Sequence, residues 1–227
     1  MQLNLFEKTF ESYEGLVFFD LETTGFNPRE ETIIELALIV VNPRDGFRVV
    51  KTANVLVKAP KKLPAKIVEL THITDAMLAR EGIAEKDLIE IIKPYLNERY
   101  AWSAYNIQFD LGFLLALLKR QAPQLTFHSD IFDVMAIYKD YHKPPHKLKD
   151  AIQAYDVVFE NTHRALDDVL ATVEVFKALH AHTDTTLYLN HIGYHTTYGL
   201  NGPKLSYVKY HPQPPEKESL KRAILGV

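Results

Sequence analysis

The fold is decided by the stretch Val17-Phe18-Phe19-Asp20-Leu21-Glu22-Thr23-Thr24-Gly25. Its valine and phenylalanines favour a strand, and a run that is apolar on both faces is typical of the middle of a sheet. Side chains two residues apart on a strand point to the same face, so Asp20 and Glu22 project together. Two neighbouring carboxylates repel unless a cation lies between them, and oxygen ligands suit Mg²⁺ or Mn²⁺. The stretch predicts a central strand that ends in a divalent-metal site, although these residues could also simply end a strand and begin a turn.

The composition is that of a folded protein with a sizeable core. Hydrophobic residues make up 47% and charged residues 24% of the 227 residues, which suits one domain with or without an appendage. The absence of cysteine excludes disulfides and thiolate metal sites. A net charge of −3 argues against capture of nucleic acid by overall charge but allows a local basic groove. Because the chain shows neither a secretory signal nor a membrane-spanning apolar run, we expect a cytoplasmic protein.

Hydrophobic periodicity predicts further strands around the first one. Residues 33–41 and 47–57 favour strands, and the dense turn signal at residues 42–46 makes them an antiparallel hairpin. Together with the first strand they form a meander. Other elements are expected, in chain order, at residues 65–70 (helix), 84–96 (helix), 101–105 (strand), 126–130 (strand) and 131–141 (helix). Thr74 or Asp75 is expected to cap a helix.

A second polar segment, Asn106-Ile107-Gln108-Phe109-Asp110, follows the strand at residues 101–105 and opens a helix. Asn106 is a plausible N-cap for this helix. Asp110 lies one turn further on, so the two side chains can share a face. A carboxylate in the first turns of a helix is also favoured by the helix dipole alone, which is the alternative interpretation.

A third segment, Asn161-Thr162-His163-Arg164-Ala165-Leu166-Asp167-Asp168, opens a long helix that ends near residue 180. Thr162 is the expected cap. Asp168 borders the apolar stripe of this helix, which is a poor place for an unpaired carboxylate. His163 lies at the start of the helix, where a lone histidine is usually structural.

These three segments, in this order, resemble the motifs of the DEDDh 3′–5′ exonucleases of the ribonuclease H-like superfamily. The likeness is greatest to the epsilon-type proofreading exonucleases of bacterial DNA polymerase III. His163 before Arg164 matches the histidine subclass, since the tyrosine subclass would have tyrosine at position 164. The resemblance implies a mixed five-stranded sheet, with three antiparallel and two parallel strands, flanked by helices. We expect an exonuclease domain at residues 13–182, an N-terminal tail at 1–12 and a small C-terminal extension at 183–227.

The resemblance also implies the residues of the active site. Four carboxylates, those of Asp20, Glu22, Asp110 and Asp168, would hold two divalent ions, Mg²⁺ or Mn²⁺, and such a pair can serve phosphodiester hydrolysis. His163 would be the general base, since an imidazole titrates near neutral pH. The positions that match substrate-contacting residues of the family are Leu21, Thr23, Thr24, Phe26, His72 and Asn106. Asp133 matches a helix-starting aspartate.

The implied reaction is stepwise release of nucleoside 5′-monophosphates from the 3′ end of single-stranded DNA, in replication proofreading or repair. One alternative is a 3′–5′ exoribonuclease that trims short RNA, because no residue here identifies a contact to a 2′-hydroxyl. A rival of another class is a non-catalytic accessory protein that tethers partners.

Both ends of the chain lie outside this resemblance. Gln2-Leu3-Asn4-Leu5-Phe6 resembles the pentapeptide with which bacterial replication proteins bind the sliding clamp, although its apolar residues could also pack on the protein's own core. A polymerase subunit is a second possible partner.

The basic loop at residues 139–149 is a candidate for contacts to phosphate, or a solvated loop. In the extension, aromatic residues with Lys204 and Lys209 could stack on bases, or form a packed β-hairpin that turns at Asn201-Gly202. A short terminal helix is possible at residues 216–227.

Overall fold

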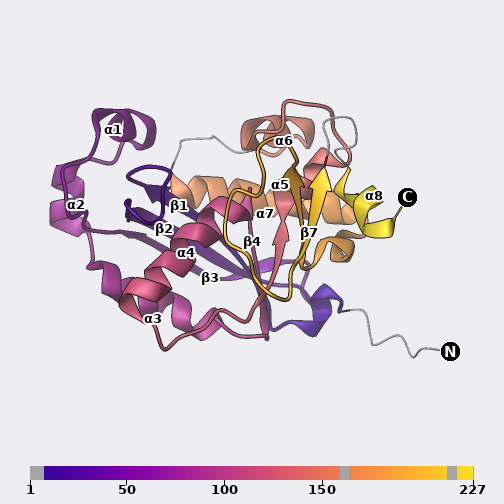
Figure 1. Ribbon diagram of the computed structural model, residues 1–227, viewed down its shortest axis with the longest axis horizontal. Coiled ribbons are helices and arrows are strands. Elements are labelled where there is room, and N and C mark those ends of the chain that lie inside the picture. Colours follow the sequence, from indigo (N-terminus) through magenta and orange to yellow (C-terminus); the bar gives the residue numbers. More distant parts are fainter. Residues whose placement is uncertain (1–7, 159–163, 214–218, 227) are drawn as a thin grey trace.

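The computed structural model describes residues 8–158, 164–213 and 219–226. A mixed five-stranded sheet, in the order β3-β2-β1-β4-β5, forms the centre of the molecule, and helices cover both of its faces (Figure 1). The strands are β1 (Gly15–Thr23), β2 (Ile33–Asn42), β3 (Arg48–Leu56), β4 (Tyr100–Ala104) and β5 (Asp130–Asp133). β1 pairs with β2 and β2 with β3 in antiparallel fashion, whereas the β1–β4 and β4–β5 pairs are parallel. The predicted sheet of three antiparallel and two parallel strands is therefore confirmed.

The central position of β1 follows from apolar side chains on both of its faces. Val17 and Phe19 pack with α4 (Ile107–Gln121) in the hydrophobic core on one face of the sheet. Leu16 and Phe18 pack with α7 (Ala165–His182) in the core on the other face. Because side chains alternate along a strand, the even-numbered residues that follow Phe18 also face α7. Burial on both faces explains why this strand is apolar almost throughout.

The other helices that precede the C-terminal extension connect and cover the strands. They are η1 (Phe10–Ser12), α1 (Ala65–Thr71), α2 (Asp75–Glu81), η2 (Glu85–Asp87), α3 (Leu88–Ile92), η3 (Lys93–Tyr95), α5 (Val134–Lys139) and α6 (Leu148–Ala154), where η marks a 3-10 helix. The prediction of one helix over residues 84–96 was wrong, because two 3-10 turns flank the short α3. Pro94 lacks a backbone N–H and cannot extend an α-helix that precedes it. Nowhere in the described ranges does a helix have both the length and the apolar character that a membrane span needs.

Helix caps differ in part from the predictions. Thr74 caps α2, since its side chain accepts from the Met77 N–H, as predicted. Asn106 does not cap α4 through its side chain and has a left-handed backbone with φ of 83°. The Ile107 N–H at the start of α4 instead donates to Oδ2 of Asp133 at 3.1 Å. Asp133 also caps α5 by accepting from the Ala136 N–H, which agrees with its predicted role. Thr162 lies outside the described residues.

The C-terminal extension packs along β5. Its elements are η4 (Thr185–Tyr188), β6 (His191–His195), β7 (Lys209–Gln213) and α8 (Leu220–Leu225). β6 and β7 are parallel, so the β-hairpin alternative was wrong, and residues 196–208 form a long connection rather than a tight turn. The Asn190 N–H donates to the Ile131 carbonyl at 2.7 Å, and the Ile131 N–H donates back to Oδ1 of Asn190 at 3.0 Å. These bonds cover the edge of the sheet, which protects it from pairing with another chain.

Candidate active site

Three carboxylates meet at the carboxyl end of β1. Asp20 and Glu22 project from β1 toward α7, and Asp168 lies in the first turn of that helix. Each of these residues contributes one carboxylate oxygen to a group of three oxygens that all lie within 4.8 Å of one another. The structure thus brings together residues from positions nearly 150 apart in the sequence, as the motif order predicts.

Asp110 reaches the same end of β1 from the opposite face of the sheet. It lies in the first turn of α4 and is only 3% exposed. Its Oδ1 accepts a hydrogen bond from the Leu21 N–H at 3.1 Å, so it is held against the backbone between Asp20 and Glu22. Burial raises the pKa of Asp110, and the charges of Asp20 and Glu22 raise it further. The fourth predicted carboxylate, Asp110, is therefore close enough to Asp20 and Glu22 for their charges to affect its pKa.

The cluster carries more negative charge than it can hold without a cation. Burial raises the pKa of Asp20 to about 8, with contributions from the charges of Asp168 and Glu35. Burial likewise raises the pKa of Glu22 to about 8, and Asp20 adds to the effect. Closely spaced carboxylates of this kind keep protons unless a cation replaces them. Because hard oxygen ligands suit Mg²⁺ and Mn²⁺, the donor set fits divalent metal.

Glu35 and Arg164 form an ion pair that sequence reasoning missed. Glu35 lies on β2 opposite Glu22 and is fully buried. Nη2 of Arg164 lies 2.6 Å from Oε1 of Glu35, and the Arg164 Nε–H also donates to both carboxylate oxygens at 3.2 Å. The Ala165 N–H donates to Oε2 of Glu35 at 3.2 Å, which ties the first turn of α7 to the sheet. An acidic residue within the apolar run at residues 33–41 is the signal that could have revealed the pair, since a buried charge needs a partner.

The predicted substrate-contacting residues on and after β1 have different surroundings. Leu21 is 4% exposed and belongs to the hydrophobic core. The Thr23 hydroxyl donates to the Gly25 carbonyl at 2.7 Å, and the Thr24 hydroxyl donates to Glu31, so both hydroxyls shape the β1–β2 connection. Phe26 is 84% exposed, which leaves its ring available to a ligand.

Other predicted residues lie away from the cluster or beyond the described part of the chain. His72 is exposed and ends α1 with a left-handed backbone, and no described contact joins it to the carboxylates. Asn106 is exposed beside the start of α4. His163 and the segment at residues 2–6 lie outside the described residues, so their roles stay predictions.

The mixed five-stranded sheet, with an acidic cluster at the end of its central strand, is the fold and site that the resemblance of the motifs to ribonuclease H-like nucleases predicts. The family model RNase_T, described as Exonuclease, matches residues 17–176. The chain belongs to this exonuclease family. The class predicted from the three motifs is thus confirmed, and membership in a family that works with divalent metal agrees with the carboxylate cluster.

Curated relatives and solved structures agree with this assignment. The chain is 30% identical over 179 residues to the PolC-type DNA polymerase III of Clostridium perfringens, covering 77% of this chain but only 12% of that much longer protein. It is 25% identical over 185 residues to the DNA polymerase III subunit epsilon of Treponema pallidum, covering 78% of this chain and 83% of the subunit. The fold is similar to that of E. coli exonuclease I in complex with a dA16 oligonucleotide, with a TM-score of 0.65, 20% identity, and coverage of 74% of this chain and 41% of that one.

Proposed function

We propose that this protein is a 3′–5′ exonuclease that removes nucleoside 5′-monophosphates from single-stranded DNA with two divalent ions, Mg²⁺ or Mn²⁺. The observation that carries the proposal is the convergence of Asp20, Glu22 and Asp168, with oxygens within 4.8 Å of one another, beside the buried Asp110. A scaffold or accessory protein has no use for such a cluster, which costs folding energy through repulsion.

Each residue has a defined part in the proposed reaction. The four carboxylates hold the ions, which when bound supply Lewis acidity at the scissile phosphate. His163 accepts a proton from the attacking water as general base, typically a contribution of roughly 10²–10⁴ in rate. The water oxygen forms the new bond to phosphorus, and the bond to the 3′-oxygen of the preceding nucleotide breaks. Products are one nucleoside 5′-monophosphate and a strand that is shorter by one nucleotide.

The proposed substrate is supported by what the relatives are. Two of them are DNA polymerase III proteins, and the structural neighbour was crystallised with a DNA oligonucleotide. From this resemblance we propose a role in replication proofreading or repair. The exposed ring of Phe26 offers a surface on which a terminal base could stack.

Digestion of 5′-labelled oligonucleotides tests the proposal. DNA and RNA strands of the same sequence are incubated with the protein in EDTA, Mg²⁺ or Mn²⁺. We expect a metal-dependent ladder on DNA that Asp20→Asn abolishes and that the matched surface variant Glu69→Gln leaves intact, since Glu69 is exposed on α1. A ladder on RNA alone would show an exoribonuclease instead. If neither strand is shortened under any condition, the enzyme proposal is wrong.

We also propose, from the sequence of residues 2–6, that the N-terminus binds the bacterial sliding clamp. An extended peptide can bury Leu5 and Phe6 in an apolar cleft while Gln2 makes polar contacts at its rim, and Leu3 is a further candidate contact. Leu5→Ala with Phe6→Ala should abolish binding in a calorimetric titration with purified clamp. Unchanged affinity in this double variant would exclude the segment as the binding site.

A further inference from the structure

Two histidines face each other across the parallel strands of the C-terminal extension. His191 begins β6, and His211 lies in the middle of β7. Nδ1 of His191 and Nε2 of His211 are 2.8 Å apart, whereas the ring centroids are 4.9 Å apart and the ring planes differ by only 13°. The rings therefore meet edge to edge, with one nitrogen pointing at the other. We call these two side chains the histidine pair.

The register of the two strands explains how the rings meet. His191 lies opposite Lys209, and Gly193 lies opposite His211. Because side chains alternate along a strand, all four positions belong to the same face of the small sheet. Glycine has no side chain, so none from β6 stands directly opposite His211, and its ring can reach diagonally to His191.

The histidine pair is in the protonation state that ligates metals. Burial, with contributions from the charges of His211 and Lys209, lowers the pKa of His191 to about 4. Burial also lowers the pKa of His211, and Lys209 adds to this effect. Both rings are therefore neutral near pH 7, and a neutral imidazole has one nitrogen with a free electron pair. Protons then compete little with a metal ion for these nitrogens.

The chemistry of the histidine pair differs from that of the carboxylate cluster. Imidazole nitrogens suit Zn²⁺, Cu²⁺ and Ni²⁺, whereas carboxylates suit Mg²⁺ and Mn²⁺. A tetrahedral Zn²⁺ with ordinary bonds to nitrogen holds two such nitrogens about 3.3 Å apart, so the rings need to separate by only about 0.5 Å. Both histidines are partly exposed, which lets an ion and its remaining water ligands reach them.

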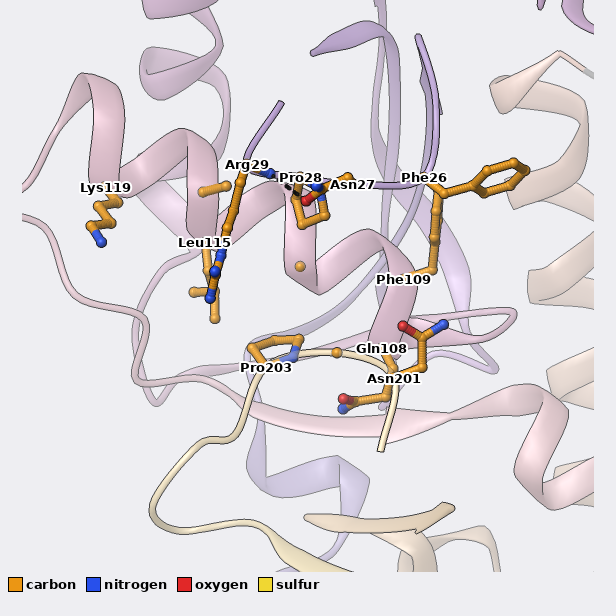
Figure 2. Close-up of a pocket in the computed structure, with 13 residues that line it drawn as sticks. Phe26, Asn27, Pro28, Arg29, Gln108, Phe109, Leu115, Lys119, Asn201 and Pro203 are labelled. Atoms are coloured by element: carbon orange, nitrogen blue, oxygen red, sulfur yellow. Dashed lines mark hydrogen bonds between the residues drawn. The ribbon is translucent and has the colours of Figure 1, made fainter. Parts of the chain in front are cut away.

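A cross-link at the histidine pair would act on a part of the chain that reaches α4. Residues 196–208 connect β6 to β7, and Figure 2 shows Asn201 of this connection beside Gln108 at the start of α4. Gly202 lies so close to α4 that a Cβ there would be 2.8 Å from the Gln108 carbonyl oxygen. Joining β6 to β7 would close the base of the connection and so limit its local unfolding.

We propose that His191 and His211 bind a transition-metal ion that prefers imidazole, Zn²⁺ in the first instance, which replaces their shared hydrogen bond and cross-links β6 to β7. The proton on the facing nitrogen moves to the other nitrogen of its own ring, so each neutral imidazole donates one electron pair to the ion. Water supplies the remaining ligands. This site lies outside the carboxylate cluster and does not depend on the proposed exonuclease function.

Calorimetric titration of Zn²⁺ in the presence of excess Mg²⁺ measures binding at this site. The test variant is His191→Gln/His211→Gln, and the matched control is His128→Gln/His182→Gln, at two exposed histidines elsewhere in the chain. All proteins carry Asp20→Asn and Asp168→Asn, so that the carboxylate cluster contributes little to the heat. We expect the test variant to bind Zn²⁺ at least about tenfold more weakly than the wild-type histidine pair, with the control unchanged. Equal affinity in the test variant and the control would overturn the proposal.

Two measurements on the intact histidine pair keep the test independent of the folding of the double variant. Electron paramagnetic resonance of bound Cu²⁺ should show coupling to two nitrogens, and coupling to oxygen ligands alone would refute the site. Lys209→Gln keeps both imidazoles and removes the ammonium whose charge acts on them. This variant should bind Zn²⁺ more tightly at low ionic strength, because like charges repel. Unchanged or weaker binding would place the ion elsewhere.

Protection from proteolysis tests the cross-link itself. Lys204 is exposed within the connection and is a site for trypsin. Zn²⁺ should slow cleavage after Lys204 in the wild-type protein and raise its Tm by roughly 5–10 °C at a concentration of about 100 times Kd. Neither effect should occur in His191→Gln/His211→Gln. Equal protection of the two proteins by Zn²⁺ would show that the ion does not join β6 to β7.

Discussion

Replacement of Arg164 by methionine tests whether the buried ion pair with Glu35 secures the active site. The change removes every hydrogen bond from the guanidinium to Glu35 while keeping an unbranched apolar side chain. Glu35, which is fully buried, would retain only the Ala165 N–H among its described partners. A carboxylate left in this position must stay charged without a counterion or take up a proton.

The expected loss of folding stability follows from the burial of Glu35 and Arg164. Removing one member of a buried pair typically costs 3–5 kcal/mol. Because the Arg164 side chain is 32% exposed, water can reach the vacated space, and we expect a loss of about 3 kcal/mol at the lower end of that range. For a chain of this size this corresponds to a fall in Tm of roughly 6–12 °C. The first turn of α7 would also loosen, and a misplaced Asp168 should lower kcat by about 10²-fold.

Chemical denaturation and oligonucleotide hydrolysis measure the two effects. The matched control is Arg99→Met, because Arg99 pairs with Glu14 at the surface, where the two side chains are 61% and 47% exposed. Such a pair contributes at most about 1 kcal/mol. Arg164→Lys should recover only part of the loss, since an ammonium cannot reproduce the bidentate geometry. If Arg164→Met costs no more than Arg99→Met, the ion pair does not stabilise the site and the argument is refuted.

Three further predictions follow from the site and the extension. Asp110→Asn should abolish metal-dependent hydrolysis yet leave the metal-free Tm unchanged or higher, because it removes a carboxyl group whose ionisation is opposed by burial and by the charges of Asp20 and Glu22. Preserved activity would contradict the proposed role of Asp110. In EDTA, Tm should fall as pH rises from about 5 to 8, because Asp20 and Glu22 have folded-state pKa values of about 8 and hold protons that the unfolded chain has already released. Mg²⁺ should reverse this fall in Tm. An equal fall in the Asp20→Asn variant would show that these carboxylates are not its cause. Asn190→Ala should lower the free energy of unfolding in urea by about 2–3 kcal/mol, because it removes side-chain hydrogen bonds to both Ile131 and Asp130 and leaves alanine at a φ of +59°. A change below about 0.5 kcal/mol would mean that these hydrogen bonds do not anchor the extension.

The sequence by itself indicated four of the five strands and the residues of the acidic cluster, whereas the fifth strand lies at Asp130–Asp133 instead of the predicted residues 126–130. β1 is apolar on both faces because it is central, and its two carboxylates share a face because strand side chains alternate. Asp110 and Asp168 lie near the starts of helices that the apolar periodicity predicts. These positions are local properties, whereas the meeting of the carboxylates was predicted from the resemblance of the three motifs to the exonuclease family, and the structure brings Asp20, Glu22 and Asp168 together beside Asp110.

Contacts between distant segments were decided only by the tertiary structure. Asn106 is a good N-cap by type, but the folded chain places Asp133 at the start of α4 instead. Glu35 lies 129 residues from its partner Arg164, and nothing in its immediate neighbours indicates that partner. Likewise, the parallel pairing of β6 with β7 and the close approach of Pro203 to Gly112 of α4 depend on how the extension docks on the rest of the chain. Propensity and periodicity report only the nearest neighbours of a residue, whereas these contacts depend on the packing of the whole chain.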